Sequence, residues 1–406
     1  GPAAAVGDAF GGLYKADAFA TFAKVLIFGA AAVAVVMAPG FFERTAGDGM
    51  RPEYSVLILF SAVGMAMMVS AGDLLTLYVG LELQSLAAYV LASMMRRDLR
   101  SAEAGLKYFV LGALASGILL YGISLVYGFS GTTGFDAVAT AYTGAHSKGL
   151  LFGLVFVFAG LAFKMSAVPF HMWTPDVYEG APTPVTAFFG SAPKVAAMLL
   201  AVRVAVEAMG PATFEWRQIV VFASLASIVL GAAGAIGQGN IKRLLAYSSI
   251  NNVGFALVGL AAGTPQGVSA VLIYMAIYIV MTLGSFLVVL QMKDADGQSI
   301  ESVASLSGMS RTRPGLAFAL AVMMFSLAGI PPLFGFYAKF VVFWAAVEAG
   351  LLVYAAIGIA LSAVGAYYYL RIVKTMYFDE PATAFAPVRD PVEGGLIVAS
   401  TVFLSP

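Results

Sequence analysis

Long apolar segments separated by short polar loops follow one another along the whole chain. A helix needs about 20 apolar residues to cross the hydrocarbon of a bilayer. Eleven segments reach this length, at residues 18–38, 54–72, 73–95, 104–130, 150–178, 184–208, 217–237, 243–262, 267–291, 315–345 and 350–370. A twelfth begins near Leu396 and is cut short by the chain end. The pattern predicts an all-α polytopic membrane protein that forms a single membrane domain over residues 1–406, with no soluble domain.

Basic residues are distributed unevenly between alternate loops, if each loop is numbered by the segment that it follows. Odd loops hold Arg44, Arg51, Arg96, Arg97, Arg100, Lys242, Arg243, Lys293, Arg311, Arg313, Arg371, Lys374 and Arg389. Even loops hold only Lys148 and Arg217. Because cytoplasmic loops carry the excess of Lys and Arg, odd loops should face the cytoplasm and the first span should start outside. A miscounted span would destroy this asymmetry, so the bias also supports the count of eleven.

Two of the predicted spans are unusually long and contain proline near their middle, at Pro169 and at Pro331-Pro332. Proline removes a backbone donor and clashes with the preceding turn, so each helix should break there. The breaks lie about 162 residues apart, and the spans around them correspond at an offset of five. Because that offset is odd, the second unit should be inverted. We therefore predict two inverted five-helix repeats, 54–208 and 217–378, an arrangement typical of transporters. Two unrelated proline kinks are the alternative.

The composition narrows the possible functions. Hydrophobic residues make up 61% of the chain and charged residues 11%, against about 25% charged residues in soluble proteins. Lys plus Arg and Asp plus Glu number 22 each, so no excess of positive charge indicates nucleic-acid binding. The chain has no Cys and only two His, His146 and His171, which excludes disulfides and Cys-bound iron–sulfur clusters and argues against haem and multi-His metal centres. We expect a protein that works without a redox cofactor of its own.

Four charged residues fall near the middle of predicted spans, where a charge costs on the order of 2.5–3.5 kcal/mol. They are Glu82, Lys164, Lys194 and Lys339. Structural ion pairs between helices would be the ordinary explanation. Glu82, however, heads a polar stripe on one helix face that also holds Tyr78, Ser85 and Tyr89. This face should point inward, and the four charges together favour a functional role.

Other polar positions are more ambiguous. Lys107 lies near the cytoplasmic end of its span, where a lysine can snorkel. His171 lies seven residues after Lys164, and a proton relay and a structural histidine are equally compatible with it. The segment 247–252 is polar enough to hold water across the middle of its span. Lys242 and Arg243 open the eighth span and favour a role as topology signals. Arg203 and Glu348 lie near span ends and favour a structural role. Asp176 and Glu179 lie at the cytoplasmic mouth, where simple solvation is favoured.

Buried lysines suit proton transfer for a physical reason. A low dielectric disfavours the ammonium form, and a nearby carboxylate favours it again. At about 6.5 Å and an effective dielectric near 20, that attraction is about 2.6 kcal/mol. Moving the carboxylate would therefore load or unload the lysine. A Glu–Lys pair backed by further lysines and water forms a switchable path for protons that needs neither metal nor nucleotide.

Five segments resemble the antiporter-like N subunits of respiratory complex I, the NADH:quinone oxidoreductase, whose mitochondrial counterpart is subunit 2. They are Gly80–Leu86, Gly105–Gly112, Phe163–Asp176, Ile241–Ser249 and Ser326–Pro332. The resemblance covers nearly the whole chain. Since that family has fourteen helices, this chain would lack about the first two and most of the last. The expectation of a longer native protein agrees with a chain that opens on Gly1 without Met.

The resemblance implies proton translocation driven by quinone reduction in other subunits. By motif, the family's proton-transfer residues fall on Glu82, Lys107, Lys164, Lys194 and Lys339. A lysine at position 339 distinguishes this chain from the sister subunit M, which has Glu there. The resemblance further implies a multi-pass protein of the bacterial inner membrane, rather than the mitochondrial one, with no cofactor on this chain and no direct NADH site. Its partners would be an M-type neighbour, small membrane-arm subunits and lipids.

Three alternatives stay open at the level of sequence. A subunit of a multi-subunit sodium/proton antiporter would share these helices and the same Glu–Lys logic. A small-molecule secondary transporter would need a roomy central pocket, whereas the ionisable residues here are spread along the midplane. A structural membrane scaffold would not place four charges at the centre of its spans.

Overall fold

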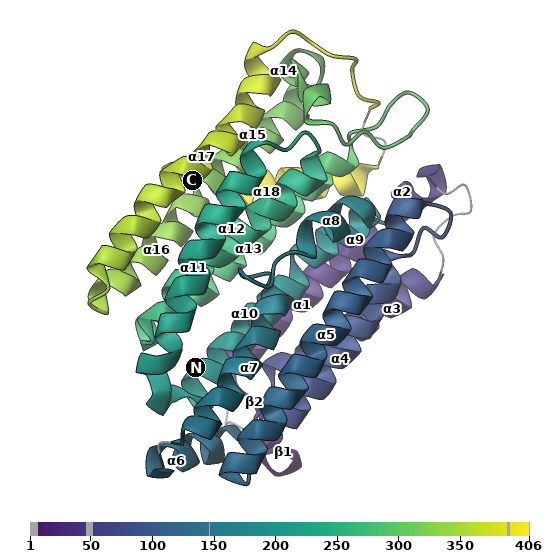
Figure 1. Cartoon of the computed structure of the whole chain (residues 1–406). Helices are drawn as coiled ribbons and strands as arrows, with labels where there is room; N and C mark the ends of the chain where they lie inside the picture. The colour runs from purple at the N-terminus through teal and green to yellow at the C-terminus, as the bar shows by residue number, and fades with distance from the viewer. Residues whose placement is uncertain (1–6, 46–51, 146, 388–389, 406) are drawn as a thin grey trace.

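The computed structural model describes residues 7–45, 52–145, 147–387 and 390–405 and is almost entirely helical (Figure 1). A short hairpin, β1 (Gly7–Ala9) and β2 (Tyr14–Ala16), precedes the helices. The first half holds α1 (Ala18–Val36), α2 (Pro39–Thr45), α3 (Pro52–Val69), α4 (Leu74–Ala92), α5 (Leu99–Ser130), α6 (Phe135–Ala145), α7 (Lys148–Met165), α8 (Thr174–Gly180), α9 (Thr183–Gly190) and α10 (Ala192–Arg203). The second half holds α11 (Thr213–Ile236), α12 (Ile241–Ala262), α13 (Pro265–Leu290), α14 (Met309–Thr312), α15 (Pro314–Ala328), α16 (Phe334–Glu348), α17 (Leu352–Phe378) and α18 (Pro391–Leu404).

The predicted spans are found in the structure. Ten helical stretches in the described part are long and apolar enough to cross a membrane, and α15 with α16 forms the eleventh span in two pieces. The truncated twelfth span is α18, which begins five residues before Leu396. The proline breaks are also confirmed, between α7 and α8 and between α15 and α16. Arg51, His146 and Arg389 lie outside the described residues.

The sixth span differs from the continuous helix expected over 184–208. It is divided at Ser191, where φ is −112° and ψ is −91°, into α9 and α10. Pro193 lies two residues after this point and lacks the N–H that would continue the helical hydrogen bonds. The span then ends in a π-helical turn, Val204–Ala208. Since a proline in the first turn of a helix is also compatible with a new start, the sequence alone does not separate a kink from a break.

Close helix pairs form each half of the molecule. In the first half α3 packs on α4 and α5 on α7, and in the second half α11 packs on α12 and α15 on α17. Helices α8, α9 and α10 lie between the two groups and contact α12 and α13 (Figure 1). This arrangement is compatible with two inverted repeats, but their boundaries, 54–208 and 217–378, stay a prediction.

Buried Arg203 joins the end of α10 to Asp17, the N-cap residue of α1 that directly follows the hairpin. Its guanidinium donates to both oxygens of Asp17 at 2.8 Å and to Glu207 Oε1 at 2.7 Å. Lys15 of β2 donates to the other oxygen of Glu207 at 2.7 Å. These contacts fit the structural role expected for Arg203.

Glycine permits the close approach of α5 and α7. A Cβ at Gly122 would lie 2.7 Å from the carbonyl oxygen of Gly153 and 2.8 Å from the amide nitrogen of Val157. Small residues of this kind let membrane helices pack backbone to backbone.

We expect Gly122→Ala to destabilise the protein by about 1–3 kcal/mol, because backbone atoms of α7 must move to admit the methyl group. Gly117→Ala is a matched control on the same helix, since its Cβ would meet no atom within 4 Å. Thermal unfolding of the detergent-solubilised protein measures both. Equal melting temperatures for the two variants would contradict this account of the α5–α7 contact.

Candidate functional site

Lys164 lies in the last turn of α7 and is only 6% exposed. Its ammonium donates to Ser85 Oγ at 2.7 Å and to Tyr89 OH at 3.2 Å, both on α4. These are two of the polar residues that were expected to share a helix face with Glu82. The inward orientation of that face is therefore confirmed for Ser85 and Tyr89.

Glu82 is half-buried, whereas Ser85 and Tyr89 are buried. Its Oε1 is buried and has no hydrogen-bond partner within the described residues. No ion pair within 4 Å joins Glu82 to Lys164 there, although the two side chains interact electrostatically. The carboxylate and the ammonium thus belong to one electrostatic unit without direct contact.

The break after α7 turns on Ser166, which has a left-handed conformation with φ of 64°. This conformation is uncommon for any residue except glycine and costs about 1–3 kcal/mol. The Ser166 hydroxyl accepts a hydrogen bond from Thr174 Oγ1 at 2.6 Å and another from the ammonium of Lys194. These two contacts give a physical reason for serine at a strained position.

Lys194, in the first turn of α10 and 1% exposed, also donates to the carbonyl oxygen of Met165 at 3.2 Å. A helix end leaves such carbonyls without partners and carries a partial negative charge, so a cation is favourable there. The Lys194 nitrogen lies 4.9 Å from the ring centre of Trp173 and 5.7 Å from that of Tyr178. The side chain is therefore held by a carbonyl, a hydroxyl and two aromatic faces, and no carboxylate of the described residues forms an ion pair with it.

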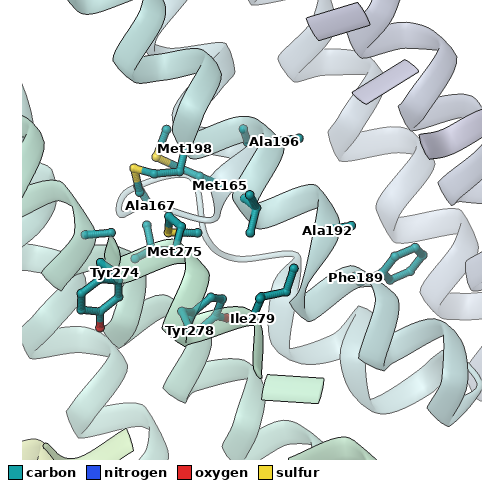
Figure 2. Packing of buried hydrophobic residues seen from close by; sticks show 14 of the residues in the cluster. Met165, Ala167, Phe189, Ala192, Ala196, Met198, Tyr274, Met275, Tyr278 and Ile279 are labelled. Carbon is teal, nitrogen blue, oxygen red and sulfur yellow. The ribbon is translucent and has the colours of Figure 1, made fainter. Parts of the chain in front are cut away.

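Apolar side chains close the space around this break. Figure 2 shows Met165 and Ala167 at the break, Ala192 and Ala196 on α10, and Met275 on α13. All five are buried. This packing makes the surroundings of Lys194 water-poor and its polar contacts correspondingly important.

The second break has a related arrangement. Gly329, with φ of 82°, ends α15 in the left-handed conformation. The preceding carbonyl, of Ala328, accepts a hydrogen bond from the Lys339 ammonium at 3.0 Å, and Ser362 Oγ accepts another at 3.1 Å. The Lys339 nitrogen lies 4.4 Å from the ring centre of Phe255. A pocket of about 350 Å³ borders the side chain.

A third group of polar residues lies on α12, which packs against both α8 and α16. Asn252 accepts a hydrogen bond from Tyr274 OH at 2.7 Å and donates to Tyr369 OH at 3.1 Å. Ser249 accepts one from Tyr278 OH at 2.9 Å. The polar character expected for 247–252 is thus confirmed, but tyrosines from α13 and α17 complete it. Those tyrosines were missed, because an aromatic residue in an apolar helix gives no sign of where its hydroxyl points.

Lys107 on α5 is 40% exposed and forms ion pairs with Glu103 at 2.6 Å and with Asp176 at 2.8 Å. Arg243 pairs with Asp176 at 2.6 Å and with Glu179 at 3.0 Å. The expectation of simple solvation for the two acidic residues is therefore wrong. Both are half-buried and bound to basic groups from other helices.

Lys242 is likewise more than a topological signal, since it is 2% exposed. It donates to the carbonyl oxygens of Glu179 and Ala181 at 2.9 and 2.7 Å and to Glu301 Oε1 at 3.1 Å. Burial raises the pKa of Glu301, but Lys242, Asn240 and Arg100 outweigh it and lower the pKa below its usual value. Glu301 therefore remains ionised at neutral pH.

His171 is half-buried in the loop between α7 and α8. No hydrogen bond joins it to Lys164 or Lys194 in the described structure, so its relay role stays a prediction. No group of three or more His, Cys, Asp or Glu that could hold a metal ion occurs among the described residues.

A family model described as "NADH:quinone oxidoreductase/Mrp antiporter, TM" matches residues 71–365. The chain belongs to this family. NADH-quinone oxidoreductase subunit N of Rhizorhabdus wittichii is 70% identical over 407 residues, which cover 100% of this chain and 84% of that protein. The subunit of the same name from Erythrobacter litoralis is 62% identical over 398 residues, which cover 98% and 81%.

Two solved structures share the fold. A chain of respiratory complex I from Thermus thermophilus superposes with a TM-score of 0.84 at 34% identity, covering 98% of this chain and 84% of that one. A chain of the Mrp complex from Dietzia superposes with a TM-score of 0.79 at 25% identity, covering 91% and 68%. Together with the spanning helices and the bacterial relatives, these similarities identify a multi-pass protein of the bacterial inner membrane.

We expect Glu301→Gln to lower the free energy of unfolding by about 1–3 kcal/mol at pH 7, because it leaves buried Lys242 without its carboxylate. A carboxyl with a lowered folded-state pKa stabilises the fold above its ordinary value and loses that contribution as the pH falls through the lowered value. The difference between variant and parent should therefore shrink below about pH 4.5. Thermal unfolding across this range measures it, with Glu380→Gln as an exposed control. A pH-independent difference would contradict the ionic contribution.

Proposed function

We propose that this chain is a proton-translocating membrane subunit of a bacterial NADH:quinone oxidoreductase. Quinone reduction in other subunits drives the transfer, and this chain carries out no redox chemistry and holds no cofactor. The observation that carries the proposal is the set of partners of Lys164, Lys194 and Lys339. All three are buried, and their hydrogen bonds within the described structure go to hydroxyls and carbonyls rather than to carboxylates.

Neutral partners matter because they tolerate both protonation states of a lysine. A carboxylate in direct contact would hold the proton through a strong ion pair, whereas a hydroxyl can accept from the ammonium or donate to the amine. Each lysine can therefore lose its proton without breaking an ion pair in direct contact.

The proton path begins at Glu82 and Lys164, where the charge or distance of the carboxylate sets the loading of the amine. It continues to Lys194 beside the first break, crosses the polar cluster of α12 with the help of water, and ends at Lys339, which delivers the proton to the outside. Lys107 acts on the cytoplasmic side and His171 serves as a relay at the first break.

The partners of the chain in this proposal are the other membrane-arm subunits of the complex, among them an M-type neighbour and small membrane subunits, together with lipids. A subunit of a multi-subunit sodium/proton antiporter is the second candidate, since the Mrp complex of Dietzia shares the fold. Sodium dependence of proton transport in vesicles that contain the complex separates the two functions.

We expect Lys164→Ala and Glu82→Ala each to reduce proton pumping by about tenfold or more, because a transfer step loses its titratable group. Pumping is measured in reconstituted complex as protons moved per NADH oxidised. Lys374→Ala, which removes an exposed lysine of the cytoplasmic side, is the control. Full pumping at the full rate of electron transfer in both variants would overturn the assignment.

Lys339→Glu should retain more pumping than Lys339→Ala, because a carboxyl can still take up and release a proton at this position. Both variants remove the ammonium that binds the carbonyl oxygen of Ala328, and only Lys339→Glu keeps a titratable group. The same reconstituted assay measures the two ratios. An equal loss would indicate that Lys339 serves only to hold the broken helix.

A further inference from the structure

Half-helix α8 supplies part of the environment of Lys194. Trp173, which directly precedes α8, and Tyr178, within it, place their rings at the Lys194 ammonium. Trp173 also donates through Nε1 to the carbonyl oxygen of Phe163 at 3.0 Å. Any displacement of this seven-residue segment therefore changes what surrounds Lys194.

The contacts that hold α8 come from both halves of the molecule. From the first half, Tyr108 of α5 stacks on Trp173 with ring centres 4.4 Å apart and planes 8° apart, and Lys107 binds Asp176. From the second half, α12 contributes two consecutive basic residues. Arg243 binds the carboxylates of Asp176 and Glu179 on α8, and Lys242 binds the carbonyl groups at the C-terminal end of α8.

The two basic residues of α12 differ in how tightly they are bound. Lys242 is fully engaged, because its three donors meet the two carbonyls and Glu301. Arg243 is half-buried and reaches Asp176 and Glu179 through one nitrogen, Nη1. Because a seven-residue helix has few intrahelical hydrogen bonds of its own, such tertiary contacts must provide most of its order.

We propose that Arg243 is a positioning residue of the translocation chain: by gripping Asp176 and Glu179 it holds α8 so that Trp173 and Tyr178 enclose the ammonium of Lys194. This inference rests on the proposed role of Lys194 in proton transfer. In this role Arg243 anchors α8 and carries no proton itself, although its partner Asp176 also binds Lys107 of the proposed path. It links the second half of the chain, through α12, to the first broken helix.

The test uses the assembled complex in proteoliposomes and measures protons moved per NADH oxidised, beside the rate of electron transfer and the amount of assembled complex. Arg243→Gln should lower the proton ratio about three- to tenfold, the range of a coupling free energy of about 0.7–1.4 kcal/mol. Arg243→Lys should restore at least half of the parent ratio, because one ammonium still binds the two carboxylates. Arg311→Gln, which removes another cytoplasmic arginine paired with an exposed acidic residue, is the matched control and should be unchanged.

A double-mutant cycle shows whether Arg243 acts through the aromatic groups. Tyr178→Leu removes one ring from Lys194, and Tyr178→Phe keeps it. If Arg243 acts by placing that ring, then Arg243→Gln should lower the proton ratio by a clearly smaller factor in the Tyr178→Leu background than in the Tyr178→Phe background. Equal costs in both backgrounds would overturn the inference.

Asp176→Asn removes the pair with Arg243 from the other side, together with the pair between Asp176 and Lys107. It changes the shape little and replaces Arg243→Gln if that variant does not assemble. Lys194→Ala separates the two proposals. Parent-like pumping in Lys194→Ala would refute the role of Lys194, and the inference with it. Loss of pumping in Lys194→Ala, with Arg243→Gln or Asp176→Asn behaving like Arg311→Gln, would refute the inference alone.

Discussion

A helix that breaks inside a membrane leaves carbonyl groups that neither the helix nor lipid can satisfy. In this protein the last such carbonyl of each first half-helix, at Met165 and at Ala328, accepts a hydrogen bond from a buried lysine. The requirement to satisfy the backbone therefore holds an ammonium at each break. The same contact explains how a residue that is expensive to bury keeps a defined position, and why that position coincides with the middle of a span.

The two breaks solve this problem with different parts. At the first break, Lys194 comes from α10 in the next span, and the strained Ser166 adds a hydroxyl to its contacts. At the second, Lys339 comes from the second half of the same broken helix, and Gly329 makes the turn without strain. The first site is enclosed by the rings of Trp173 and Tyr178, whereas the second borders a pocket. The lysine therefore contacts the break from a different helix at each site, and only the second of the two sites borders a pocket.

Features governed by local chemistry were predictable from sequence. Helix length follows from apolar runs, the breaks follow from Pro169 and Pro331, and the cost of burying a charge singles out the central lysines. Features that depend on which helices meet were not. Asp176 and Arg243 are 67 residues apart, and neither position differs in sequence from an ordinary solvated loop end. The tyrosines that complete the α12 cluster also escaped, because their hydroxyl partners depend on helix rotation. The interruption of the sixth span at Ser191 was not predicted, because a proline in the first turn of a helix is compatible with a continuous span as well as with a new start.

The carboxylates that hold helices together lie apart from the buried lysines proposed to transfer protons. Along the cytoplasmic side, carboxylates contact basic groups directly and fix helices relative to one another, as Asp176 and Glu301 do. At the three buried lysines, the hydrogen-bond partners among the described residues are neutral, and Glu82 forms no ion pair with Lys164 there. Ion pairs in contact resist a change of protonation, because losing one charge strands the other. Charge acting across a gap instead adjusts proton affinity by an amount that falls as the distance grows. A protein that must both stay folded and move protons therefore gains from keeping contact ion pairs at its cytoplasmic side and charges that act across a gap near the middle of the membrane.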